Sequence, residues 1–200
     1  MPETPLKRPL LRPDEDLEAF KPTEARDFIA MYLEPDPRTG RLTLFDHRYV
    51  LARPETLVNI QKQLEQTVGQ STKGFLYLAG EKSAQEGLHL VERLTEGIDT
   101  RSMNVQGLKR MIDVLALLGW GRFEIAELDV DARRYGLSLS NSPLAEAYGP
   151  SKRPVCHLLA GFLAGIGLDL LGQGLLCEET ACKAQGKPRC EFRLQPMPFA

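Results

Sequence analysis

Three of the four cysteines in this chain lie within fourteen residues near the C-terminus. The segment "CEETACKAQGKPRC" contains Cys177, Cys182 and Cys190, and Cys156 lies upstream in "RPVCHLLAGF". Thiols that meet in space can form disulfides, act as a redox pair or bind a metal ion. The cellular compartment and the elements that carry the cysteines decide between these chemistries.

The composition is that of an ordinary globular chain and excludes several function classes. Its 200 residues are enough for one substantial core, with 42% hydrophobic and 26% charged residues. A net charge near −2 gives no electrostatic basis for binding nucleic acid. No run approaches the roughly 20 apolar residues of a membrane span, and the N-terminus lacks the apolar stretch of a secretory signal. We therefore expect a cytoplasmic protein, in which clustered cysteines bind metal more often than they form disulfides.

Proline is concentrated at the start of the chain. Seven of the fourteen prolines fall in the first 37 residues. Proline removes backbone donors and disfavours helix, so residues 1–20 are predicted to form an extended or disordered arm. Residues 21–200 show no linker or repeat and are predicted to form a single domain.

The first half of this domain predicts strands and then helices. An alternating pattern over residues 41–52, after the turn sequence "PDPRTG", predicts a strand or a pair of strands. A helix is expected over 54–69, with an apolar face formed by Leu57, Ile60 and Leu64.

Two further helical regions follow. Residues 73–97 predict one helix or two, interrupted around Gly80. Residues 104–121 predict a helix that ends at Gly119. Its inward-facing residues are expected to be Leu108, Met111, Ile112 and Leu115.

The second half predicts hairpins around a buried helix. Residues 122–142 alternate as a β-hairpin, and residues 154–172 are apolar on nearly all sides, as in a central helix. Gly161 and Gly165 would let another element approach that helix closely. Two strands end the chain, at 174–180 and 189–195. Helices combined with hairpins predict an α+β fold around a mainly antiparallel sheet.

These elements bring the cysteines into a pattern suited to zinc, which takes four converging thiolate, imidazole or carboxylate ligands. Cys182 and Cys190 would come from the two arms of the last hairpin, and Cys156 from the start of the buried helix. The fourth ligand is either Cys177, which gives the commoner four-cysteine site, or Glu179, which is nearer to Cys182 in sequence. Buried free thiols are the alternative without a metal.

The spacing resembles the vinyl-4-reductase domain family. The resemblance rests on Cys156, on E-T-A-C at 179–182 and on Cys190 followed by E-F-R-L. It extends in outline over 45–195 and is motif-specific over 154–194. The family includes the sensor domains of phenol- and xylene-responsive bacterial activators and a small protein linked to bacteriochlorophyll synthesis. It implies the fold of vesicle-tethering complex (TRAPP) subunits: a twisted, mainly antiparallel sheet backed by helices around a small-molecule cavity.

The resemblance also implies a ligand set for zinc. In the aromatic-sensing members three cysteines and one glutamate hold the ion, which here gives Cys156, Glu179, Cys182 and Cys190. Four protein ligands leave no open position, which is typical of a structural ion rather than a catalytic one. The formal charge of about −2 on such a site could be offset by nearby cations. These are Arg153, Lys183, Lys187 and Arg189.

A ligand pocket is the second implication of the resemblance. Its expected lining is Met111, Trp120, Phe123, Tyr135, Leu158 and Phe162. Tyr135 stands where the phenol sensors carry a tryptophan that helps to hold the hydroxyl, so a larger or more apolar ligand is expected as readily as phenol.

The function expected from these features is binding rather than catalysis. The regulators continue into ATPase and DNA-binding modules, whereas this chain ends at Ala200. We expect a free-standing, zinc-stapled homodimer that binds an apolar or aromatic molecule as a sensor, carrier or assembly factor, with a protein partner for any action on transcription. The alternatives are an enzyme or accessory protein in tetrapyrrole vinyl reduction, and a scaffold with a vestigial cavity. No nucleotide or flavin motif supports an independent reductase, so the chain is not expected to be an enzyme.

Overall fold

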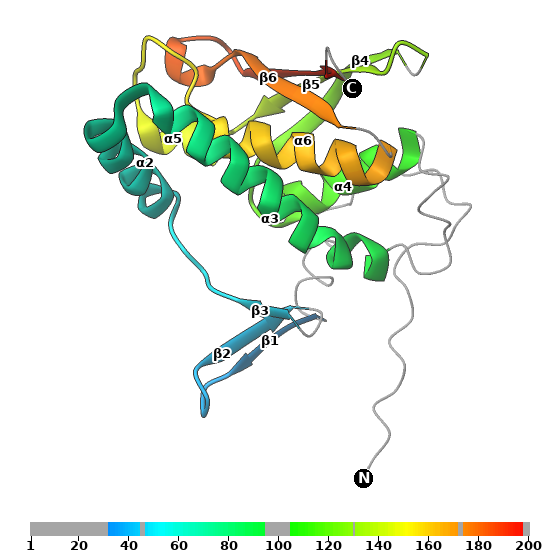
Figure 1. Ribbon diagram of the computed structural model, residues 1–200. Coiled ribbons are helices and arrows are strands. Elements are labelled where there is room, and N and C mark those ends of the chain that lie inside the picture. Colours follow the sequence, from blue (N-terminus) through cyan, green and yellow to red (C-terminus); the bar gives the residue numbers. More distant parts are fainter. Residues whose placement is uncertain (1–31, 45–46, 95–104, 130, 172–173, 198–200) are drawn as a thin grey trace.

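The computed structural model describes residues 32–44, 47–94, 105–129, 131–171 and 174–197 (Figure 1). The proline-rich arm expected at 1–20 lies outside these residues and stays a prediction. The described chain forms two antiparallel sheets and a layer of helices. The α+β class and the mainly antiparallel sheet predicted from the sequence are confirmed.

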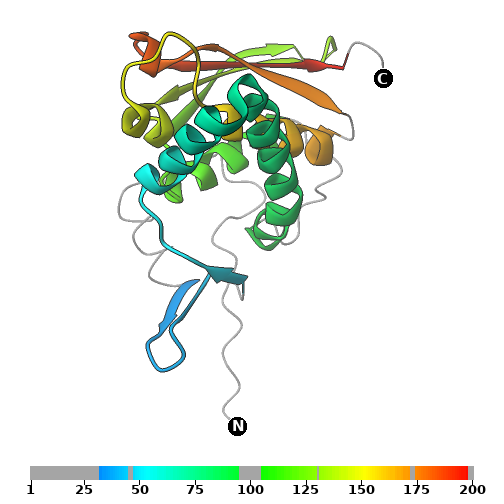
Figure 2. The ribbon, with the colours of Figure 1, turned by 60° about the vertical axis from the view of Figure 1, so that its left-hand side comes forward.

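The larger sheet carries the C-terminal half of the chain. Its strands are β4 (Arg122–Asp129), β5 (Arg134–Ser140), β6 (Leu175–Ala181) and β7 (Cys190–Pro196). Their order is β4-β5-β7-β6, and every neighbouring pair is antiparallel. Burial alternates along β6 and β7, so one face of the sheet meets the helices and the other meets solvent. Figure 2 shows the sheet and the helices as two layers.

The helices lie on the buried face of this sheet (Figures 1 and 2). They are α2 (Pro54–Val68), α3 (Thr72–Leu94), α4 (Val105–Leu117), α5 (Pro143–Tyr148) and α6 (His157–Leu171), with short 3₁₀ turns at Gly69–Ser71 and Lys183–Gln185. Within the part of the chain that the structure describes, none of them combines the length and the apolar character needed to cross a membrane.

Helix α2 begins and ends where the sequence predicts, and two of the three residues expected on its apolar face, Leu57 and Leu64, are half-buried. Ile60 was expected inside and is 52% exposed, whereas Val58 and Gln61 are buried. The prediction was wrong for Ile60, because α2 lies at the end of the helix layer and packs mainly against α5 and α3, so that part of the expected face stays uncovered. Apolar spacing shows that a face exists but not which residues the neighbouring helices cover.

Close packing of α3 on α6 forms the centre of the helix layer. A Cβ atom on Gly161 would overlap the carbonyl group of Tyr77, and one on Gly80 would overlap that of Leu158. A Cβ atom on Gly165 would lie 2.6 Å from the carbonyl oxygen of Glu81. The predicted close approach at Gly161 and Gly165 therefore occurs, and the partner is α3. The interruption predicted near Gly80 is absent, and α3 continues through this residue. Gly80 instead allows the close contact between α3 and Leu158 of α6.

A short helix, α5, precedes the segment that leads into α6, and no periodic sequence pattern predicts it. The Ser142 side chain caps α5 by accepting a hydrogen bond from the Ala145 N–H, at 3.3 Å. Pro143 occupies the first turn and Gly149 ends the helix with a φ of 80°. Six residues are too few for a periodic pattern, but the Ser-Pro pair and the glycine are recognisable end signals.

The smaller sheet follows the order β1-β2-β3 and contains β1 (Leu33–Asp36), β2 (Arg41–Leu44) and β3 (His47–Tyr49). The paired-strand alternative for residues 41–52 is therefore correct. Leu44 of β2 and Val114 of α4 are both buried and form a second apolar cluster. This contact attaches the small sheet to the helix layer.

Candidate metal centre

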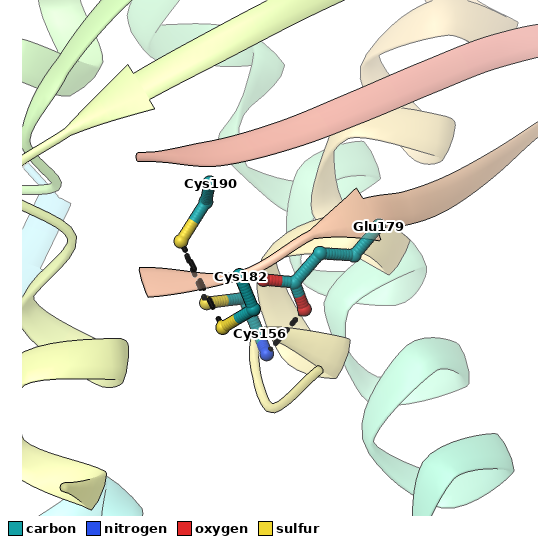
Figure 3. Close-up of side chains that lie close together, drawn as sticks. All are labelled: Cys156, Glu179, Cys182 and Cys190. Carbon is teal, nitrogen blue, oxygen red and sulfur yellow. Dashed lines mark hydrogen bonds between the residues drawn. The ribbon is translucent and has the colours of Figure 1, made fainter. Parts of the chain in front are cut away.

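Four side chains from three elements converge at the end of the terminal hairpin (Figure 3). Cys156 directly precedes α6, Glu179 lies in β6, Cys182 follows β6, and Cys190 opens β7. One atom from each, a sulfur or a carboxylate oxygen, lies within 4.8 Å of the corresponding atoms of the other three. All four residues are buried. The sequence motif and the geometry therefore select the same residues.

A β-bulge makes this convergence possible. The pairing of β6 with β7 shifts register between Glu179 and Ala181. In a regular strand Glu179 and Cys182, three positions apart, would face opposite sides of the sheet. The additional residue at the bulge turns Cys182 inward, and both side chains are buried. No feature of the sequence indicated this bulge.

The sulfur separations fit a tetrahedral thiolate site. The Sγ atoms of Cys156 and Cys190 lie 3.8 Å apart, and those of Cys190 and Cys182 lie 3.9 Å apart. Zn–S bonds of about 2.3 Å at tetrahedral angles require an S···S distance of about 3.8 Å. A disulfide would need about 2.05 Å, and all four cysteines are free. The arrangement suits an ion between the sulfurs and not a bond between two of them.

The two carboxylate oxygens of Glu179 have different roles. One accepts a hydrogen bond that holds the side chain in place, and the other remains available to the cluster. The backbone N–H of Cys156 donates to Oε2 at 2.8 Å. Oε1 is buried and has no hydrogen-bond partner among the described residues. Burial, and after it the neighbouring Cys182, raise the pKa of the Glu179 carboxyl to about 8. A buried carboxylate oxygen without a partner costs free energy, and a metal cation would remove that cost.

The thiols influence each other strongly. Hydrogen bonding with Cys182 and Cys190, together with burial, raises the pKa of the Cys156 thiol. Hydrogen bonding with Cys156 and Cys182 lowers the pKa of the Cys190 thiol to about 4, and the Lys183 N–H donates to its sulfur at 3.4 Å. Without a cation, four acidic groups this close cannot all ionise. A divalent ion would allow all of them to be deprotonated.

Two of the cations expected to offset the site's charge pair with carboxylates at the surface. Lys183 Nζ lies 2.6 Å from Glu146, and Arg189 lies 4.0 Å from Glu124 and 3.7 Å from Glu191. Polar uncharged groups, rather than these cations, contact the cluster. The Cys156 N–H donates to Glu179, the Lys183 N–H donates to Cys190 Sγ, and the Ser142 hydroxyl lies beside Cys156 Sγ.

Cys177, the competing fourth ligand, is buried outside the cluster. It shares the inward face of β6 with Glu179, two residues away, a spacing of about 7 Å along a strand. Its backbone N–H donates to the Tyr77 hydroxyl at 3.0 Å, which covers part of the outer edge of β6. The geometry therefore favours Glu179 over Cys177 as the fourth ligand.

The residues expected to line a pocket divide into two groups. Trp120 and Phe162 are half-buried and stack, with ring centroids 6.4 Å apart and an interplanar angle of 14°. Leu158, one turn before Phe162 on α6, is also half-buried. Phe123 and Tyr135 are core residues, at 6% and 5% exposure. The side chain of Met111 lies outside the described part of the structure.

The fold and the site define a class of protein: an antiparallel sheet with helices on one face and a buried three-cysteine, one-glutamate cluster at its terminal hairpin. The vinyl-4-reductase domain family model matches residues 137–196, which include all four residues of the cluster. This part of the chain is similar to the vinyl-4-reductase domain family, and the resemblance inferred from the cysteine motif is confirmed.

Two curated relatives are similar to most of this chain. The phenol regulator MopR of Acinetobacter guillouiae is 24% identical over 171 residues, which cover 81% of this chain and 30% of that protein. The transcriptional regulatory protein XylR of Pseudomonas putida is 24% identical over 167 residues, covering 76% and 28%. The chain therefore spans less than a third of the length of either relative.

Solved structures support the fold. The phenol-responsive sensory domain of the activator PoxR, solved with phenol, matches with a TM-score of 0.73 and 20% identity, covering 88% of this chain and 92% of that one. A vinyl-4-reductase family protein from Methanocaldococcus jannaschii has a TM-score of 0.51 at 22% identity, covering 74% and 83%. A trafficking protein particle complex subunit 3 from Naegleria fowleri, covalently bound to palmitic acid, has a TM-score of 0.56 at 14% identity, covering 71% and 93%. The predicted likeness to the vesicle-tethering fold is confirmed.

Proposed function

We propose that this chain is a small-molecule sensor domain whose terminal hairpin and central helix are joined by a structural zinc ion. Zinc is the metal favoured by three thiolates and one carboxylate with tetrahedral spacing. Cys156, Cys182, Cys190 and Oε1 of Glu179 would hold it, and it would supply a fixed crosslink with no open coordination position. The unpartnered Oε1 supports this assignment.

Glu179→Gln is expected to weaken zinc binding by at least tenfold, because a neutral amide replaces the carboxylate in a site of three thiolates. Cys177→Ser is the matched control, a buried cysteine two residues away on the same strand face, and should leave zinc affinity within about twofold of the unmodified chain. Chelator competition measures both. Loss of zinc from Cys177→Ser together with its retention in Glu179→Gln would reverse the assignment of the fourth ligand.

We propose that the ligand is an apolar or aromatic molecule that reaches the pair Trp120 and Phe162. The observation that carries this proposal is the position of α6: Cys156 immediately precedes the helix, and Phe162 on it stacks against Trp120. Half-buried stacked aromatics beside a core are suited to apolar ligands. Met111, Phe123, Tyr135 and Leu158 are the proposed remainder of the lining. The descriptions of MopR as a phenol regulator and of PoxR as phenol-responsive support this class of ligand.

The intrinsic fluorescence of Trp120, the sole tryptophan of the chain, provides the test. Titration with phenol, xylene and a naphthalene derivative should give a saturable change for at least one probe. Phe162→Ala should weaken that binding roughly tenfold or more, or about 1.4 kcal/mol, by removing a stacking surface. Phe75→Ala, which truncates an exposed aromatic on α3, is the control and should bind as the unmodified chain does.

Absence of a saturable response to every probe would contradict the proposed ligand class. A visible absorption spectrum of a bound tetrapyrrole in the purified protein would favour a role in vinyl reduction instead. The homodimer, a protein partner and the cytoplasmic location remain predictions. The proposal concerns the sensor role alone, because the chain corresponds to under a third of the length of its full-length relatives.

A further inference from the structure

The Cys156 segment is held at three atoms by three different elements. The Gln61 side chain of α2 donates to the Val155 carbonyl at 3.2 Å, and the Cys156 N–H donates to Glu179 at 2.8 Å. The third contact reaches the sulfur itself: the Ser142 hydroxyl lies 3.4 Å from Cys156 Sγ. Ser142 is 1% exposed, so water does not compete for its hydroxyl group.

The donor in this third contact follows from the inventory of hydrogen-bond groups. The Ser142 oxygen already accepts from the Ala145 N–H at 3.3 Å, which leaves its single O–H free to donate. A cysteine that binds a metal does so as a thiolate, which has no proton to give. In a loaded site the hydroxyl must therefore donate to the sulfur of Cys156.

We propose that Ser142 is a positioning residue of the metal centre, which orients the Cys156 thiolate and stabilises its charge. The inference rests on the proposed zinc site and adds a residue to it from outside the cysteine motif. It also gives the α5 cap a second role, because one hydroxyl joins the start of α5 to the thiolate. The Lys183 N–H makes the corresponding contact to Cys190, at 3.4 Å. Both sulfurs thus receive an oriented donor, as metal-bound groups commonly do.

Two substitutions separate this role from helix capping. Ser142→Ala removes both the hydroxyl and the cap, whereas Ser142→Gly removes the hydroxyl but keeps most of the capping preference. Zn²⁺ affinity is measured on the full 200-residue chain by chelator competition, with circular dichroism of each variant to confirm the fold. Both variants should bind Zn²⁺ roughly 10- to 100-fold more weakly than the unmodified chain.

A Co²⁺-loaded sample provides a readout that capping alone would not change. Loss of a hydrogen bond raises the energy of the sulfur lone pair, so the thiolate-to-cobalt charge-transfer band should move to longer wavelength in both variants. Unchanged affinity and an unmoved band in Ser142→Gly would overturn the inference and leave the zinc site intact. An unmodified chain that binds neither Zn²⁺ nor Co²⁺ would overturn the zinc site and, with it, the inference.

Discussion

Cys182→Ser is expected to release the metal and to lower the free energy of unfolding by about 4 kcal/mol. The four proposed ligands would tie the residue before α6 to both strands of the terminal hairpin, and the substitution removes one of them. Structural zinc contributes on the order of 10 kcal/mol in small peptides. The effect should be smaller here because α6, β6 and β7 also belong to a continuous apolar core.

Urea denaturation followed by circular dichroism measures this change, with the zinc content of each sample determined in parallel. The same substitution should weaken probe binding at Trp120, because α6 carries both Phe162 and the connection to Cys156. Cys177→Ser is the matched control and should keep its zinc. A Cys182→Ser variant without zinc but with unchanged stability would argue against a structural ion.

Gly161→Ala is expected to destabilise the domain by about 3 kcal/mol, the upper range for overpacking. The added methyl group would overlap the Tyr77 carbonyl, so α3 and α6 would have to separate. The Tyr77 carbonyl is part of the backbone, and a Cβ atom has a fixed position on its own backbone. Neither group can therefore relieve the overlap by changing a rotamer. The shift should also disturb the Tyr77 hydroxyl, which accepts from Cys177 at the edge of β6.

Gly74→Ala provides the control on the same helix pair. Gly74 lies in α3, and a Cβ atom there would meet nothing within 4 Å. Alanine at this position should raise stability by up to about 1 kcal/mol through its helix propensity. Equal unfolding midpoints for Gly161→Ala and the unmodified chain would show that the two helices do not pack at this contact.

Much of the secondary structure could be predicted because it depends on local patterns. Alternation of apolar and polar residues predicts strands β4 to β7. Pro54 and Gly69 mark the two ends of α2, and the continuous apolar stretch identifies α6 as the buried helix. The four proposed ligands followed from the family's motif, whereas spacing alone left Cys177 and Glu179 as alternatives. The geometry favours Glu179, since one of its carboxylate oxygens lies within 4.8 Å of the three sulfurs and its Oε1 has no hydrogen-bond partner among the described residues.

The features that could not be predicted depend on tertiary contacts. Whether Ile60 or Val58 faces inward depends on where α5 and α3 lie. A glycine in a helical pattern is equally compatible with a break or a contact, and Gly80 is a contact because Leu158 lies against it. The bulge at Glu179 and the donor at Ser142 fix the site's geometry, but neither carries a periodic signal.

Native mass spectrometry of the full chain, purified without chelator, tests the proposed zinc centre most directly. We expect one zinc ion per chain, retained in Cys177→Ser and lost in Cys182→Ser. Metal-free chains of all three proteins under these conditions, with intact folds, would contradict the zinc centre.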